Sequence, residues 1–211
     1  MDRFKSDGAP RTGANGHLRE KPIASPKGIA ERAINAIGKA RMDHRPGRIT
    51  TLFIAESAPT GGTFFYYGNG HLGRYLQRSI EEVLAGDGDF LQRFKSYGWY
   101  LDDLVLAPVN HLTPRERRAA HLEAAHDLQR RIAEYRPLAI VCLLKGIRAI
   151  VRAAASEAHF DGPFFEVPFP GNRQQRRFHL QMIDIIPKLP REPLSEPAIG
   201  RDPPEPCDNR Q

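Results

Sequence analysis

The sequence lacks any apolar run that approaches the roughly 18 residues needed to cross a membrane. Its first stretch, MDRFKSDGAPRTGANGHLREK, contains no apolar core of the kind that a secretory signal has. Only two cysteines are present, Cys142 in an apolar stretch and Cys207 in a polar one, so we predict no disulfide. Two thiols also cannot supply a four-thiolate iron–sulfur cluster. These absences predict a protein of the reducing cytoplasm, with no membrane partner.

Common cofactor and metal motifs are missing as well. There is no Gly-x-Gly-x-x-Gly fingerprint and no phosphate-loop lysine motif. His111, His121 and His126 do not form a metal-ligand pattern, because the last two are five residues apart on a predicted helix and so do not share a face. We therefore predict neither a metal nor another cofactor.

The excess of positive charge is confined to one end of the chain. The net charge is +6, and the first 50 residues alone hold 11 Lys and Arg against 5 Asp and Glu. Residues 1–47 are poor in large apolar side chains and rich in Gly, Pro and Arg, which predicts a largely disordered basic arm with a short helix near 28–41. Such an arm either binds nucleic acid through phosphate contacts or simply keeps the chain soluble, and composition favours neither.

Strands and helices are expected to alternate through the rest of the chain. Apolar runs predict strands, and helical periodicity predicts helices. The strands are expected near 49–55, 99–107, 138–144 and 164–169, and the helices near 72–85, 89–97, 114–135, 147–158 and within 171–186. The helix from Pro114 is the best marked, because Thr113 is a typical N-cap and Glu116 can complete a capping box.

This alternation predicts an α/β fold, namely a three-layer α/β/α domain over residues 48–186 with a central, mostly parallel four-stranded sheet. Residues 187–211 are rich in Pro and charge and predict a disordered tail. In parallel sheets of this kind, ligands gather beyond the carboxyl ends of the strands. The loops after the expected strands are therefore the places to search for a site.

The first such loop begins at Glu56. A carboxylate at a strand end, beside Ser57, is suited to acid–base chemistry or to stabilising a positive charge. For an isolated glutamate, however, capping its own loop or pairing with an arginine is the more common role. The loop goes on to four consecutive rings, Phe64 to Tyr67, and because neighbouring side chains of an extended chain point opposite ways, we expect some to face a site and others the core. Rings on such a loop can stack on a flat heterocycle, for about 1–3 kcal/mol per base, or fill the core beneath it.

Two carboxylates, Asp102 and Asp103, interrupt the second apolar strand. Because neighbouring side chains of a strand point to opposite faces, only one of them can face a given site. A carboxylate near a strand exit accepts hydrogen bonds from the N–H groups of a base edge or from a neighbouring loop. Both interpretations stay open.

The third stretch, PFPGNRQQRRF, combines a turn with a helix start. We expect Asn172 to cap the following helix. Arg173, Arg176 and Arg177 would then lie near the positive end of that helix, which is a good place for a phosphate. The alternative is an ordinary solvated face.

Three segments, in this order over about residues 49–186, resemble the uracil-DNA glycosylase superfamily. LFIAESAPTGG is similar to its first motif and puts Glu56 at the acidic position, GWYLDDLVLAPVN is similar to its middle strand, and VPFPGNRQQRRF is similar to its second motif. Asp103 stands where the family usually has a base-reading asparagine, and Phe169 stands where it usually has a histidine. The iron–sulfur cysteines of the nearest branches are absent.

The resemblance implies hydrolysis of a base–sugar bond after the nucleotide is flipped out of DNA, acting on uracil or another damaged base. It implies that Glu56 orients water or offsets the developing cation, and that Asp103 contacts the polar edge of the base. The remaining residues would bind substrate, with Phe65 or Tyr66 stacking on the base beside Ser57, and Asn172, Arg173, Arg176 and Arg177 approaching the nucleic acid.

Two other functions remain open. The departures at Phe169 and Asp103 favour a non-catalytic nucleic-acid-binding module on the same fold. The nearly neutral stretch 51–186, with 16 Lys and Arg against 15 Asp and Glu, instead suits an unrelated doubly wound enzyme that acts on a small nucleotide-like substrate.

Overall fold

A four-stranded parallel sheet forms the centre of the molecule, with the strands in the order β2-β1-β3-β4. The computed structural model describes residues 26–193. The strands are β1 (Thr51–Ala55), β2 (Trp99–Asp103), β3 (Ala139–Cys142) and β4 (Phe164–Glu166). Every residue of β1, β2 and β3 is buried, as expected for strands that are covered on both faces.

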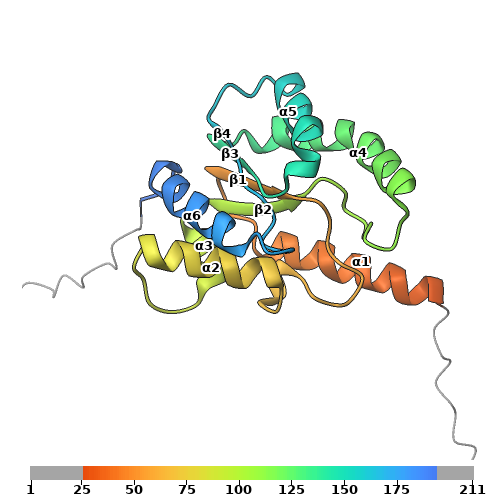
Figure 1. Ribbon diagram of the computed structural model, residues 1–211, viewed down its shortest axis with the longest axis horizontal. Helices are drawn as coiled ribbons and strands as arrows, with labels where there is room; N and C mark the ends of the chain where they lie inside the picture. The colour runs from red at the N-terminus through yellow and green to blue at the C-terminus, as the bar shows by residue number, and fades with distance from the viewer. Residues whose placement is uncertain (1–25, 194–211) are drawn as a thin grey trace, which may run out of the picture.

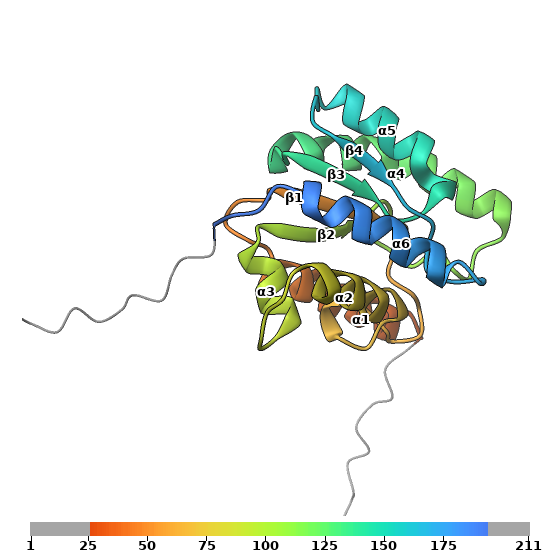
Figure 2. The same cartoon turned by 60° about the vertical axis from the view of Figure 1, so that its left-hand side comes forward.

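Helices cover both faces of the sheet. They are α1 (Pro26–Asp43), α2 (His71–Val83), α3 (Phe90–Ser96), α4 (Pro114–Tyr135), α5 (Arg148–Glu157) and α6 (Gln175–Ile185). Short 3-10 turns lie at Phe65–Tyr67, Lys145–Ile147 and Ile186–Lys188. On one face α2 packs against α6, and on the other α4 packs against α5 (Figures 1 and 2). The predicted three-layer α/β/α fold is confirmed.

The sequence signals at the start of α4 are confirmed in detail. The Thr113 side chain accepts a hydrogen bond from the backbone N–H of Glu116, and the Glu116 carboxylate accepts one from the backbone N–H of Thr113. This capping box satisfies two N–H groups that the helix itself cannot pair. The helix begins at Pro114 and ends at Tyr135, as the sequence predicted.

An aromatic cluster fills the core on one side of β1. The ring of Phe53 lies 5.2 Å from that of Phe94 and 5.6 Å from that of Trp99, measured between centroids. The indole Nε1 of Trp99 donates to the carbonyl of Pro190 at 2.8 Å. This bond ties the chain beyond α6 to the edge of β2.

Both ends of the described chain differ from expectation. Helix α1 is longer than the segment 28–41, and its Ile37 and Arg41 are buried against the domain. We expected disorder from Pro187 onward, but Leu189 is buried and the hydroxyls of Thr50 and Thr51 both donate to the Pro190 carbonyl at 3.0 Å. The rest of the expected arm (1–25) and tail (194–211, with Cys207) lies outside the described residues.

The second strand is also shorter than predicted, because β2 stops at Asp103 and not at 107. Its last two residues are the carboxylates that interrupt the apolar pattern.

Within residues 26–193, none of the helices has the length and apolar character needed to cross a membrane.

Candidate functional site

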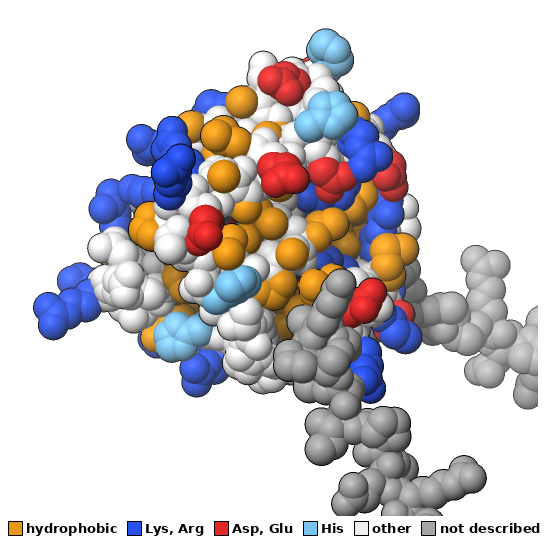
Figure 3. Space-filling view, turned by 90° about the vertical axis from the view of Figure 1, so that its right-hand side faces the viewer, with side chains coloured by type: hydrophobic (Ala, Val, Ile, Leu, Met, Phe, Trp, Pro, Cys, Tyr) orange, Lys and Arg blue, Asp and Glu red, His pale blue; other side chains and the backbone are white. Residues whose placement is uncertain are grey.

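A cavity of about 740 Å³ lies at the carboxyl ends of the strands, within the range typical of ligand sites. Its lining comes from all four strand ends and the start of α2. The chain passes from β1 to β2 on one side, and β3 lies on the other side of β1. Ligands of doubly wound sheets bind at such a switch point. The side of the molecule on which the loops after β1 and β2 run has hydrophobic side chains over its middle and Lys and Arg around its rim (Figure 3).

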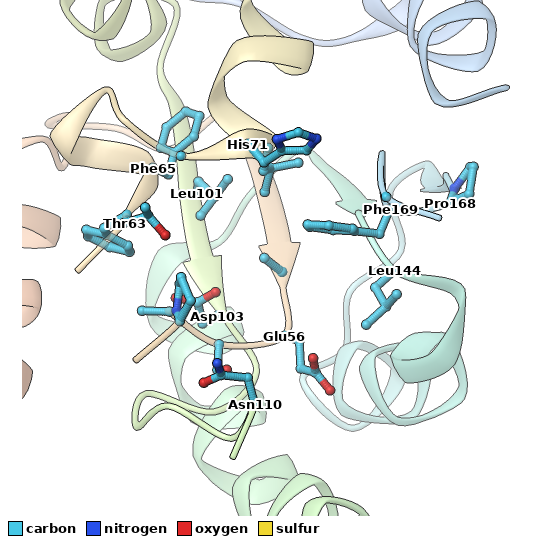
Figure 4. A pocket seen from close by; sticks show the side chains of 18 of the residues that line it. Glu56, Thr63, Phe65, His71, Leu101, Asp103, Asn110, Leu144, Pro168 and Phe169 are labelled. Atoms are coloured by element: carbon cyan, nitrogen blue, oxygen red, sulfur yellow. The ribbon is translucent and has the colours of Figure 1, made fainter. Parts of the chain in front are cut away.

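Most of the predicted site residues line this one cavity. They are Glu56, Ser57, Phe65, Asp103, Asn172 and Arg177. In Figure 4, Phe65 and His71 lie at one end, and Glu56 and Asn110 lie at the other. Leu101 and Asp103 form one side, and Phe169 and Leu144 form the opposite side. Tyr66, Arg173 and Arg176 are not among the lining residues.

Glu56 follows β1 and is held by two residues of α4. Arg117 donates to both carboxylate oxygens, from Nε to Oε1 at 2.5 Å and from Nη2 to Oε2. His121 donates from Nε2 to Oε1 at 2.8 Å. The Glu56 side chain is 14% exposed, so these partners fix a nearly buried carboxylate. The ionic pairing that the sequence left open as an alternative is therefore present, and it does not remove Glu56 from the cavity.

Asp102 and Asp103 point to opposite faces of the sheet, as their adjacent positions require. Asp102 pairs with Arg131 of α4, whose Nη2 also donates to the carbonyl of Asp103 at 2.9 Å. Asp103 lines the cavity, and its Oδ2 accepts from Arg41 of α1. Burial raises the pKa of Asp103 to about 6, although the guanidinium of Arg41 opposes this rise.

More of the four rings are buried than an alternating chain would give. Phe64, Phe65 and Tyr66 are buried, and Tyr67 is exposed. The chain there forms a 3-10 turn and is not extended, so the rings do not simply alternate. The Tyr66 hydroxyl donates to the Leu101 carbonyl at 2.9 Å and accepts from the Leu101 N–H at 2.7 Å. Tyr66 thus fastens the turn to β2, while Phe65 lines the cavity.

The loop from β4 to α6 also differs from prediction. Asn172 does not cap α6, because the helix starts at Gln175 and its N-cap residue, Gln174, makes no side-chain capping bond. Asn172 and Arg173 both have a positive φ, 47° and 62°, and so form a tight turn before the helix. A Cβ at Gly171 would lie 3.1 Å from the ring carbon Cδ1 of Phe169. A glycine there therefore leaves room for the Phe169 ring at the cavity wall.

Metal-binding geometry is absent from the described residues. Within 26–193, no group of three or more His, Cys, Asp or Glu side chains is arranged to hold a metal ion. Cys142 is buried in β3, and burial raises the pKa of its thiol to about 11. A thiol in that state is a poor nucleophile and a poor ligand.

Sequence reasoning missed several residues at the site. These are Arg41, Asn110, Arg117, His121 and Lys145. Asn110 ties the β2 loop to the β1 loop, accepting from the Thr60 N–H at 3.1 Å. A usable signal existed for Arg117 and His121, because residues four apart on a helix share one face. For Arg41 the sequence held no signal, since its partner lies in a distant segment.

Comparison with known proteins adds no relative. No protein-family model matches the chain, and no curated protein is significantly similar to it. The function must therefore be argued from the site.

Proposed function

We propose that the cavity takes a nucleobase extruded from a nucleic acid, and that the protein hydrolyses the bond between that base and its sugar. The observation that carries this proposal is the meeting of Glu56, Phe65 and Asp103 in one cavity, although they come from the end of β1, a 3-10 turn and the end of β2. An aromatic ring, a buried acceptor and a fixed carboxylate are the groups that such a reaction needs. The volume of the cavity accommodates a base together with its sugar.

The reaction needs a flat apolar slot for the base. Phe65, Leu101 and Phe169 provide apolar walls, and stacking on an aromatic ring is worth about 1–3 kcal/mol per base. Lys145 and Arg177, which also line the cavity, supply positive charge for the flanking phosphates. Flipping the nucleotide costs a few kcal/mol, which these contacts would offset.

Glu56 would act during bond cleavage. As the bond between C1′ and the base nitrogen breaks, positive charge builds on the sugar, and a carboxylate held in place stabilises it. A water oxygen then bonds to C1′, and the departing base gains a proton while the water loses one. Arg117 and His121 would keep the Glu56 carboxylate in position throughout.

A base-release assay tests this function. Labelled oligonucleotides would carry uracil, hypoxanthine, an oxidised guanine or an alkylated adenine, and alkali would cut any abasic site formed. We expect wild-type protein to release at least one of these bases and Glu56→Gln to lose activity by on the order of 100-fold. Glu123→Gln is the matched control, because Glu123 is exposed on α4 and does not line the cavity. Equal activity in Glu56→Gln and wild type would refute the role of Glu56.

A second function, nucleic-acid binding without catalysis, is favoured by one specific observation. Both oxygens of Glu56 already accept hydrogen bonds from cationic or imidazole donors, which leaves fewer lone pairs free to accept a hydrogen bond from an attacking water. Retention of oligonucleotides at low salt with no base released from any of them would favour this function over hydrolysis.

A further inference from the structure

Asp103 brings an unusual group to the cavity, a carboxylate that is only 2% exposed. Its Oδ2 accepts from Arg41, and among the residues at 26–193 no hydrogen bond reaches its Oδ1. An ionised carboxylate offers about four lone-pair sites, so Asp103 can accept further hydrogen bonds beside the one from Arg41. Because Asp103 lines the cavity, a ligand there is the natural source of those donors.

The surroundings keep Asp103 an acceptor. Arg41 carries a permanent positive charge beside it, and Arg131 donates to its backbone carbonyl. Two buried arginines thus face two buried aspartates, Asp102 and Asp103, and the charges balance. An ionised carboxylate has lone pairs to offer and no proton to give.

The other walls near Asp103 leave little choice of partner. Leu101, Phe65 and Phe169 are apolar, and Leu101 lies on the same face of β2, two residues before Asp103. A flat ring held between these walls would meet the carboxylate with its polar edge. That edge has to present N–H donors, because a carbonyl oxygen there would face another oxygen across the contact.

We propose that Asp103 makes the cavity select nucleobases that carry an exocyclic amino group on their pairing edge and reject those that carry a carbonyl oxygen or a hydrogen there. The inference rests on the proposed function only in taking the occupant to be a nucleobase. Adenine, cytosine and guanine each carry such an amino group. Uracil and hypoxanthine, the deamination products of cytosine and adenine, do not. The substrate is then a modified base that keeps its amino group.

Guanine is the best match by this chemistry. Its ring N–H and its amino group are adjacent donors, so a carboxylate can accept from both. Cytosine and adenine present their amino group beside a ring nitrogen that is itself an acceptor. Each of those two bases therefore gains one hydrogen bond to Asp103 and not two.

Matched nucleotide pairs test the inference by binding alone. Titration calorimetry would compare dCMP with dUMP and dGMP with dIMP, since the members of each pair share their sugar and phosphate and differ at the amino position. We expect the amino-bearing member of each pair to bind about tenfold more tightly or better, the size of one charged hydrogen bond. Tighter binding of dUMP or dIMP, equal binding within the pairs, or no binding of dCMP and dGMP to the folded protein would overturn the inference.

Asp103→Asn supplies the second arm. An amide offers one donor and one acceptor, which matches the adjacent carbonyl and N–H of uracil. The variant is therefore expected to shift the dCMP-to-dUMP affinity ratio toward dUMP by about tenfold or more. Because this change removes the nearer of the two carboxylates beside Arg41, Arg41→Gln combined with Asp103→Asn would be tested as well, after thermal unfolding shows that each variant is folded. An unchanged ratio in folded variants would contradict the role of Asp103.

The two proposals fail separately. Selective binding of dCMP and dGMP with no base released from any oligonucleotide would sustain the inference and end the hydrolase proposal. Efficient release of uracil, together with tighter binding of dUMP than of dCMP, would do the reverse.

Discussion

Arg41 and Asp103 form a buried ion pair, although 62 residues separate them in the chain. The pair joins the last turn of α1 to the end of β2, at the wall of the cavity. The Arg41 guanidinium also lies 5.2 Å from the centroid of the Phe64 ring. The positive charge of Arg41, on a helix that precedes the sheet, thus acts on a site at the carboxyl ends of the strands.

Removing Arg41 is expected to destabilise the fold strongly. Arg41→Met leaves Asp103 as a buried charge without its main partner, which typically costs about 3–5 kcal/mol. Combining Arg41→Met with Asp103→Leu removes both charges and should recover much of that loss. Urea denaturation of the two single variants and the double variant measures the coupling. If the two losses simply added, the pair would not act as a unit.

Base selectivity should depend on pH through Asp103. The pKa of its carboxyl is raised to about 6, so the group is an acceptor above pH 6 and gains a donor proton below it. Its electrostatic neighbours are Arg41 from α1, Asp102 on β2 and Arg131 from α4. We expect the dCMP-to-dUMP affinity ratio to be highest above pH 7 and to fall as the pH drops below 6.

Titrations between pH 5.5 and 8 would measure that ratio. Asp103→Asn serves as the control, because an amide does not titrate in this range and its ratio should stay flat. A wild-type ratio that is constant over the whole range would show that Asp103 does not carry the selectivity.

Phe169→His should raise any base-release activity. Phe169 is 38% exposed at the cavity wall, so the substitution costs little stability. Histidine would supply a donor that can stabilise negative charge on the departing base, and one such donor is worth on the order of 100-fold in rate. Single-turnover release from an oligonucleotide measures the gain. Phe169→Leu is the control, since it changes the ring without adding a donor, and an equal gain in both variants would exclude the donor explanation.

Substitutions at Tyr66 and at Phe65 should have different effects, the first on the stability of the fold and the second on nucleotide binding. Tyr66→Phe leaves the N–H and the carbonyl of Leu101 without their partner and is expected to cost about 1–3 kcal/mol of stability, with nucleotide affinity unchanged. Phe65→Leu removes a ring from the cavity and is expected to weaken nucleotide binding by about 1–3 kcal/mol. Denaturation and calorimetry on both variants test this division. Weaker nucleotide binding by Tyr66→Phe would contradict the geometry.

The fold was predictable because its signals are local. The capping residues Thr113 and Glu116 mark a helix start by themselves, and the apolar run at 49–55 marks a buried strand without reference to other segments. Parallel strands that alternate with helices bring their carboxyl ends to one edge. This rule alone was enough to place Glu56 and Asp103 in one site.

What could not be predicted depends on long-range contacts and on details of the turns. Arg117 lies 61 residues from Glu56, and although the sequence shows that Arg117 and His121 share a helix face, it does not show which carboxylate that face meets. The 3-10 turn that buries Tyr66 and the two left-handed residues that keep Asn172 from capping α6 are decided by packing, and not by propensity. Composition alone assigned α1 to a basic arm, whereas Ile37 and Arg41 are part of the folded domain.

That position of α1 bears on where the chain can be cut. A truncated protein beginning at Arg48, the boundary that the sequence suggests, would keep all four strands and lose the cation that neutralises Asp103. In such a fragment the Asp103 carboxylate at the cavity wall would have lost the positive charge of Arg41. A synthetic peptide spanning 26–45, added separately, would supply that arginine again. The smallest independently folding unit is therefore expected to start ahead of the sheet and to include the part of α1 that carries Ile37 and Arg41.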